Sequence, residues 1–293
     1  MMEAQCRRML APHSKHFTVL NFSVLGSCPD DPEDQNSATA TLRILAQAPR
    51  AEHLAPTKFV RPIIDCIMQG YPGATPDLDL RQAFPKPIFE YYVTLLPQAD
   101  IQHEVHLPFL GKDSSASDRP AQTLTIPPPP VTKTYPSRQP SQPTTEHPAN
   151  ILTDFGPTVR GPLGWIVHAR SGDKGSDANC GFWVRHDDEY AWLRSLLSTA
   201  KARELLGKEW RGDPNAYSPS SNSAEPATEG PGVMRIERFE LPELRGVHFL
   251  FRNLLDRGVS STSSVDFLGK NVAEFLRARW VDIPIKFLNR GKL

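Results

Sequence analysis

The stretch ARSGDKGSDANCG at residues 169–181 carries the chain's densest set of groups that could do chemistry. It holds three glycines, two aspartates, an arginine, a lysine and an asparagine. Gly172 and Gly175 allow backbone angles that other residues avoid and bring N–H groups close to a ligand. Successive N–H groups in such a turn form an anion-binding nest. The stretch therefore predicts a site for a carboxylate or a phosphate.

The side chains of this stretch suit the same ligand. Arg170 offers a planar fork that matches a carboxylate or phosphate, and Lys174 adds a point charge. Asn179 can hydrogen-bond a carbonyl group. Asp173 either orients Lys174 or transfers a proton, provided that burial raises its pKa. The alternative is a solvated hairpin in which Asp173 and Lys174 form a surface pair of little energetic value.

A second stretch, LDRGVSSTSSVDFLGKNVAEFLR at residues 255–277, adds Asp266 and Lys270. We expect both side chains to converge on the first stretch, with Asp266 or a nearby serine capping a helix whose N-terminus also favours an anion. The candidate catalytic residues are Asp173 and Lys174. The candidate ligand-binding residues are Arg170, Ser171, Gly172, Gly175, Asn179, Asp266 and Lys270.

Composition narrows the class of partner. The 293 residues contain 33 basic and 33 acidic side chains, so the net charge is near zero. This balance argues against nucleic acid or an anionic membrane as the main partner. No run of about 18 apolar residues is present, and the N-terminus lacks a signal-type apolar run, so we expect a cytoplasmic protein without a membrane span.

Other chemical motifs are missing from the sequence. The four cysteines form no CxxC pair and are read as reduced thiols. HEVH at 103–106 is not a metalloprotease HExxH, and we predict no metal site. No Walker loop, GxGxxG or GxSxG is found, so the cofactor stays unknown. The tryptophans, Trp183 among them, are read as core residues.

The first region, residues 1–110, predicts a small, partial α/β domain. Strands are expected at 16–26, 38–48, 88–95 and 102–109, and a helix from a Thr57 cap to the Tyr-Pro-Gly at 71–73. The second region, 111–160, is rich in Pro, Ser and Thr, and it predicts a disordered linker. Its PxxP spacing leaves open a role in recruiting an SH3-like partner.

The third region, residues 161–288, predicts a ferredoxin-like α/β sandwich. Its expected order is ββαββαβ, with the charged stretch on the turn between the first two strands. Strands are expected at 163–169, 181–186, 234–241, 246–251 and 280–285, helices at 188–206 and 267–279, and a flexible insert at 214–232. The whole chain is therefore assigned to the α+β class.

These stretches resemble the acyclic terpene utilisation (AtuA-like) family. GWIVHARSGDKGSDANCGFWVR and the 255–277 stretch resemble its small C-terminal ferredoxin-fold domain, while 68–98 and 106–109 resemble the end of its larger N-terminal domain. The resemblance implies that most of that larger domain is missing here. The low-complexity inserts are typical of fungal relatives, some of which lie near natural-product gene clusters. SSTSSVD stands where an arginine-containing stretch is expected.

The resemblance also implies a metabolic setting. The family takes its name from the breakdown of citronellol and geraniol through acyl-CoA intermediates, so the expected ligand is a carboxylate or an acyl-CoA. Whether the chain is an enzyme is left open. Two alternatives stand beside this hypothesis: an assembly module that self-associates or docks a partner chain supplying the missing part, and an inactive fragment of a larger enzyme.

Overall fold

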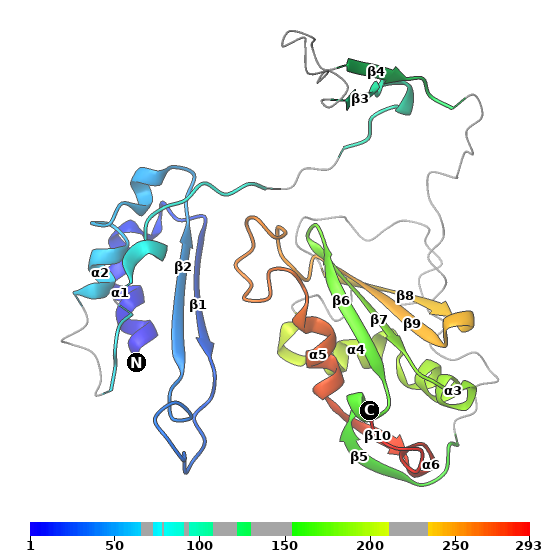
Figure 1. The fold of residues 1–293 in the computed structure, drawn as a ribbon. Coiled ribbons are helices and arrows are strands. Elements are labelled where there is room, and N and C mark those ends of the chain that lie inside the picture. The colour runs from blue at the N-terminus through cyan, green and yellow to red at the C-terminus, as the bar shows by residue number, and fades with distance from the viewer. Residues whose placement is uncertain (66–72, 78, 91–93, 108–121, 130–153, 211–233) are drawn as a thin grey trace, which may run out of the picture.

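The chain forms an N-terminal part and a C-terminal domain (Figure 1). The computed structural model describes residues 1–65, 73–77, 79–90, 94–107, 122–129, 154–210 and 234–293. The predicted insert at 214–232 and most of the predicted linker lie outside these residues. Within the described ranges, no helix is both long and apolar enough to cross a bilayer.

The N-terminal part is built on a hairpin of two antiparallel strands, β1 (Val19–Leu25) and β2 (Thr41–Gln47). Helices α1 (Met2–Ser14) and α2 (Val60–Ile64) lie beside it. Because side chains alternate along a strand, the hairpin has two different faces. One face carries Phe22, whose ring lies 4.3 Å from the guanidinium of Arg7 on α1. The apolar face of the hairpin is therefore turned towards α1.

Sequence reasoning identified some N-terminal elements and missed others. The strands expected at 16–26, 38–48 and 102–109 are confirmed as β1, β2 and β3 (His103–Leu107). Of the strand expected at 88–95, residues 88–90 and 94–95 form no strand, and residues 91–93 lie outside the described residues. Helix α2 follows Phe59 instead of a Thr57 cap, and α1 was not foreseen.

A short strand also lies inside the segment that the sequence predicted to be a disordered linker. Strand β4 (Gln122–Ile126) pairs antiparallel with β3, from His103 opposite Ile126 to Leu107 opposite Gln122. Its Thr-Leu-Thr-Ile run is rich in β-branched residues and ends at Pro127, which explains both the strand and its end.

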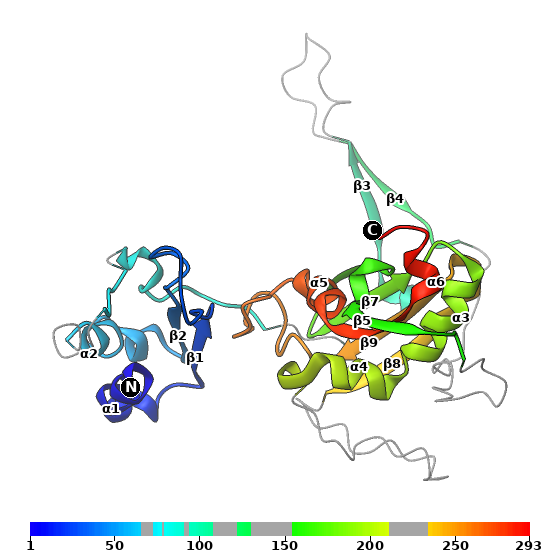
Figure 2. The same ribbon diagram turned by 90° about the horizontal axis from the view of Figure 1, so that it is seen from below.

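The C-terminal domain is a four-stranded antiparallel sheet in the order β6-β7-β9-β8. The strands are β6 (His168–Lys174), β7 (Asp177–Trp183), β8 (Arg235–Leu241) and β9 (Gly246–Arg252). Helices α3 (Asp187–Leu196), α4 (Thr199–Leu206) and α5 (Asn271–Ala278) gather on one face of this sheet (Figure 2). The predicted ferredoxin-like architecture is confirmed.

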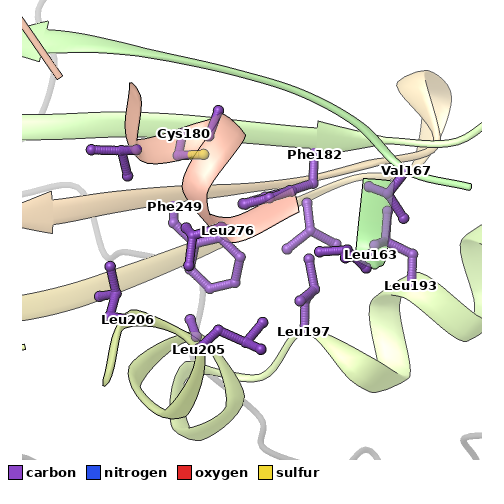
Figure 3. Packing of buried hydrophobic residues seen from close by; sticks show 14 of the residues in the cluster. Leu163, Val167, Cys180, Phe182, Leu193, Leu197, Leu205, Leu206, Phe249 and Leu276 are labelled. Carbon is purple, nitrogen blue, oxygen red and sulfur yellow. The ribbon is translucent and has the colours of Figure 1, made fainter. Parts of the chain in front are cut away.

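Two further strands lie outside this sheet. Strand β5 (Thr158–Pro162) pairs with β10 (Trp280–Pro284), and α6 (Ile285–Leu288) follows directly. The core lies between the main sheet and its helices. Phe182 and Phe249 meet edge to face at 5.9 Å between ring centroids, and Leu197 and Leu276 pack nearby (Figure 3). Among the described residues, no helix covers the other face of the sheet.

Local caps explain where the observed helices differ from the expected ones. The helix expected at 188–206 is two helices, because Ser198 ends the first and caps the second by accepting a hydrogen bond from the Lys201 N–H at 3.0 Å. The helix expected at 267–279 starts only at Asn271. The strands expected at 163–169 and 181–186 are shifted, so most of the charged stretch lies within β6 and β7 instead of on their turn.

A buried arginine joins the sheet to α3. Arg238 on β8 is only 5% exposed. Its guanidinium donates to the backbone oxygens of Leu197 at 2.7 Å and Arg194 at 3.0 Å, at the C-terminal end of α3. It also pairs with Glu240 at 2.7 Å. Burial alone would raise the pKa of Glu240, but hydrogen bonds from Arg238 and Arg194 outweigh it and lower that pKa.

Replacing this guanidinium with an apolar chain tests its role in stability. We expect Arg238→Met to lower the free energy of unfolding by about 3 kcal/mol, since it leaves two helix-end carbonyls without their donor and the half-buried Glu240 carboxylate with one donor fewer. The pKa of Glu240 is lowered in the folded state, so its stabilising contribution exists above the unfolded value of 4.5 and fades as the pH falls. The difference between variant and wild type should therefore shrink in acid.

Urea denaturation at pH 7 and pH 3.5 measures both effects. Exposed Arg185, replaced in the same way, serves as the control and should change little. Equal stability of Arg238→Met and wild type at pH 7 would contradict the assigned role.

Candidate functional site

The charged stretch lies in a hairpin at one edge of the main sheet. Lys174 on β6 pairs with Asp177 on β7, so only Gly175 and Ser176 form the turn. Gly175 has a φ of +68°, a conformation that favours glycine. Strand β6 is an edge strand, and its side chains alternate between the helix-covered face and the helix-free face.

The residues on the helix-covered side serve to hold α5. The Ser171 hydroxyl accepts from the Ala273 N–H at 2.9 Å and donates to the Lys270 carbonyl at 3.3 Å. The Asp266 carboxylate accepts from the N–H groups of Lys270 at 2.9 Å and Asn271 at 2.8 Å. Two of the candidate ligand-binding residues therefore cap the helix N-terminus.

The structure does not bring the two candidate catalytic residues together. Asp173 and Lys174 are neighbours on β6, so their side chains leave opposite faces of the sheet. Lys174 Nζ donates to the backbone oxygen of Asp173 at 2.9 Å, and no ion pair with its carboxylate is found among the described residues. A surface ion pair between them, the alternative considered above, is not formed.

On the helix-free face, a glycine makes room for a lysine. A Cβ atom placed on Gly172 would lie 3.0 Å from Lys270 Nζ and 3.6 Å from Asn179 Oδ1. Asn179 is the cross-strand partner of Gly172. Lys270 is the N-cap residue of α5, on the covered side, and its ammonium reaches over the edge of β6 to this point. The missing side chain at Gly172 thus lets residues almost 100 positions apart meet.

More cationic and polar groups surround this point. Arg170 projects from the same face of β6, opposite Gly181. A Cβ atom on Gly181 would lie 3.6 Å from His248 Nδ1 on β9. Burial, with a smaller effect from the Lys174 charge, lowers the pKa of His248, so its ring is neutral at pH 7. Over the described part of the chain, Arg170 and Lys270 have no ion-pair partner.

The carboxylates at the turn end of this face are already paired. Arg252 on β9 contacts Asp177 at 2.7 Å and Glu237 at 3.1 Å. Asp177 also accepts from the Asn253 N–H at 2.9 Å. These carboxylates already have partners, and among the described residues none of them pairs with Arg170, Lys174 or Lys270. Asn179, Arg170, Lys174 and Lys270 thus define what we call the cation face, with Gly172 at its centre.

An aromatic pair borders the cation face and was missed by sequence reasoning. The rings of His168 and Trp183 stack with centroids 5.5 Å apart and planes 13° apart. Trp183 is 39% exposed, so its reading as a core residue is wrong. The signal was the alternation in β7, where Phe182 faces the core and its neighbour must face out. The same alternation in β9 could have identified His248.

The described residues contain no group of three or more His, Cys, Asp and Glu side chains suited to a metal ion. His103 and His106 of the HEVH sequence are three apart on β3 and project from opposite faces, and His106 bonds Thr123 at 2.8 Å. Cys180 is buried in the core, and burial raises its pKa far above the usual range of a thiol. The Cys180 thiol is therefore not suited to act as a nucleophile.

Fold and site together define a class: an α+β protein whose ferredoxin-like domain presents cationic side chains on a sheet face that no described helix covers. Two family models match the chain. The acyclic terpene utilisation family protein AtuA matches residues 1–107, and the AtuA ferredoxin-like domain matches residues 161–282. The chain therefore belongs to the acyclic terpene utilisation (AtuA) family. Neither a curated protein nor a solved structure matches it.

The capping role of Ser171 predicts a loss of stability. Ser171→Ala leaves the buried Ala273 N–H without its acceptor, and we expect the free energy of unfolding to fall by about 1–2 kcal/mol. Urea denaturation measures this loss. Ser176→Ala, in the turn of the same hairpin, is the control and should cost much less. A stability equal to wild type would show that α5 does not depend on this cap.

Proposed function

We propose that this protein binds an anionic intermediate of acyclic terpene utilisation, a carboxylate or its CoA thioester, on the cation face. The observation that carries the proposal is the position of Lys270, whose ammonium lies over Gly172 beside Asn179. Both family matches belong to acyclic terpene utilisation, which supports the metabolic setting.

The electrostatics favour an anion at this point. Three cationic side chains, Arg170, Lys174 and Lys270, approach one face while the nearest carboxylates are held by Arg252. Like charges repel, so a bound anion lowers the energy of the cluster as well as pairing with it. The guanidinium of Arg170 can bind an anion through two parallel hydrogen bonds, which also fixes the ligand's orientation.

Neutral groups complete the proposed site. The Asn179 side chain offers an amide donor next to the ammonium, suited to a carbonyl oxygen. His248 is neutral at pH 7 and can donate or accept one hydrogen bond through each ring nitrogen. The proposal concerns binding alone. Lys174 contributes positive charge, and Asp173, which lies on the other face of the sheet, takes no part in proton transfer.

Truncating the central lysine tests the proposal directly. We expect Lys270→Ala to weaken binding of citronellate or citronellyl-CoA about tenfold, the equivalent of about 1.4 kcal/mol, because the central charge is removed. Titration calorimetry on the full chain measures the affinities, with coenzyme A alone as a third ligand. Lys201→Ala, which removes a partly exposed lysine that pairs with Glu204 on α4, is the matched control and should bind like wild type. Unchanged affinity in Lys270→Ala would overturn the proposal.

The glycine can be tested through the same lysine. Gly172→Ala places a methyl group 3.0 Å from Lys270 Nζ, so the ammonium must move and affinity should fall about fivefold. In a chain that already carries Lys270→Ala, adding Gly172→Ala should cost nothing further, because the displaced group is gone. Additive losses in this double-mutant cycle would mean that Gly172 acts in another way.

Loss of association instead of ligand affinity in these variants would favour the alternative of an assembly surface. Gel filtration of the same samples measures it. The cation face would then dock an acidic partner chain or a second copy, and the small-molecule proposal would be withdrawn.

A further inference from the structure

The loop between β9 and α5, residues 253–270, lies between the N-terminal hairpin and the turn of β6 and β7 (Figure 1). It is polar, yet Ser261 is 1% exposed and Thr262 is 8% exposed. Asn253 and Asp256 both take a φ of +57°, a conformation uncommon in residues other than glycine. Such a loop needs partners for its buried polar groups.

The N-terminal hairpin supplies those partners. Arg43 donates to the Ser263 backbone oxygen at 2.8 Å, and Asn21 Nδ2 contacts Ser263 Oγ at 3.2 Å. Gln47 donates to the Ser261 backbone oxygen at 2.7 Å. The pairing of Asn21 with Leu45, midway between Arg43 and Gln47, places all three donors on one face.

This polar face is the reverse of the apolar face turned to α1. Each face of the hairpin is thus committed to a different neighbour. A fourth contact comes from outside the hairpin, where Arg257 of the loop pairs with Glu90 at 3.1 Å. Arg257 also donates to the Ser261 oxygen at 2.8 Å, so the loop oxygen that Gln47 contacts is held from both sides.

The other side of the loop contacts the β6–β7 turn and Gly172, next to the cation face. The Leu255 N–H donates to the Ser176 oxygen at 2.9 Å. A Cβ atom on Gly258 would lie 3.1 Å from backbone atoms of Gly175, and one on Gly269 would lie 3.3 Å from Gly172. Asp266, in the same loop, then fixes the N–H of Lys270. The loop therefore contacts both the hairpin turn and the residue whose ammonium centres the site.

We propose that the N-terminal part sets the ligand affinity of the C-terminal domain through this loop. Asn21, Arg43 and Gln47 are positioning residues: they dock the loop, and the docked loop holds Lys270 over Gly172. The coupling rests on the proposed function, while the docking does not. Because coupling between two sites is reciprocal, ligand on the cation face should in turn tighten the docked loop.

The test uses the full chain with Arg43→Ala and Gln47→Ala combined. Hydrogen exchange read by mass spectrometry should show amides 255–271 exchanging at least tenfold faster, and the affinity for citronellyl-CoA should fall about fivefold. Arg8→Ala, an exposed arginine on α1, is the control and should change neither. A single Arg43→Lys variant, which keeps a donor at that position, should retain most of the protection of the 255–271 amides. Urea midpoints confirm that each variant is folded.

The outcomes separate the two proposals. Unchanged exchange at 255–271 overturns the docking. Faster exchange with unchanged affinity overturns the coupling and leaves the docking standing. If wild type binds none of the three ligands named above, the proposed function and the coupling fall together, while faster exchange in the variant still supports the docking.

Discussion

The capping of α5 by Ser171 and Asp266 is the constraint on which the rest of the C-terminal domain depends. A helix N-terminus leaves N–H groups without partners, and here a buried hydroxyl from β6 and a carboxylate from the preceding loop accept them. These bonds tie an edge strand to a helix that lies about 100 residues further along the chain. They fix where Lys270 leaves the backbone and therefore where its ammonium can reach.

Because of this constraint, the residues of the charged stretch on β6 fall into two sets on opposite faces of the sheet. Strand alternation sends Ser171 inward to the helix, and it sends Arg170, Gly172 and Lys174 to the face that no described helix covers. Under the proposed function, alternate residues of this one strand serve stability and ligand recognition. Removing a residue of one set should affect the free energy of unfolding, and removing a residue of the other should affect the affinity for an anion.

The N-terminal hairpin also has two faces with different neighbours. It presents an apolar face to α1 and a polar face to the loop that carries Asp266. The two segments matched by AtuA family models therefore meet through hydrogen bonds and an ion pair. Such contacts contribute little free energy individually, which suits the proposed response of this interface to a ligand.

Local pattern in the sequence determined the α+β class, strands β1, β2, β8 and β9, and the residue types of the site. Strand bounds and caps were harder to predict: the two strands that carry the charged stretch are shifted from their expected positions, and Ser198 divided an expected helix. The sequence predicted that Lys270 converges on the charged stretch, but only the tertiary structure decided that its ammonium meets Gly172 and that the side chains of Asp173 and Lys174 lie on opposite faces. The reason is physical, since spacing along a strand sets the face of each side chain, whereas contact between distant residues depends on how helix and sheet pack.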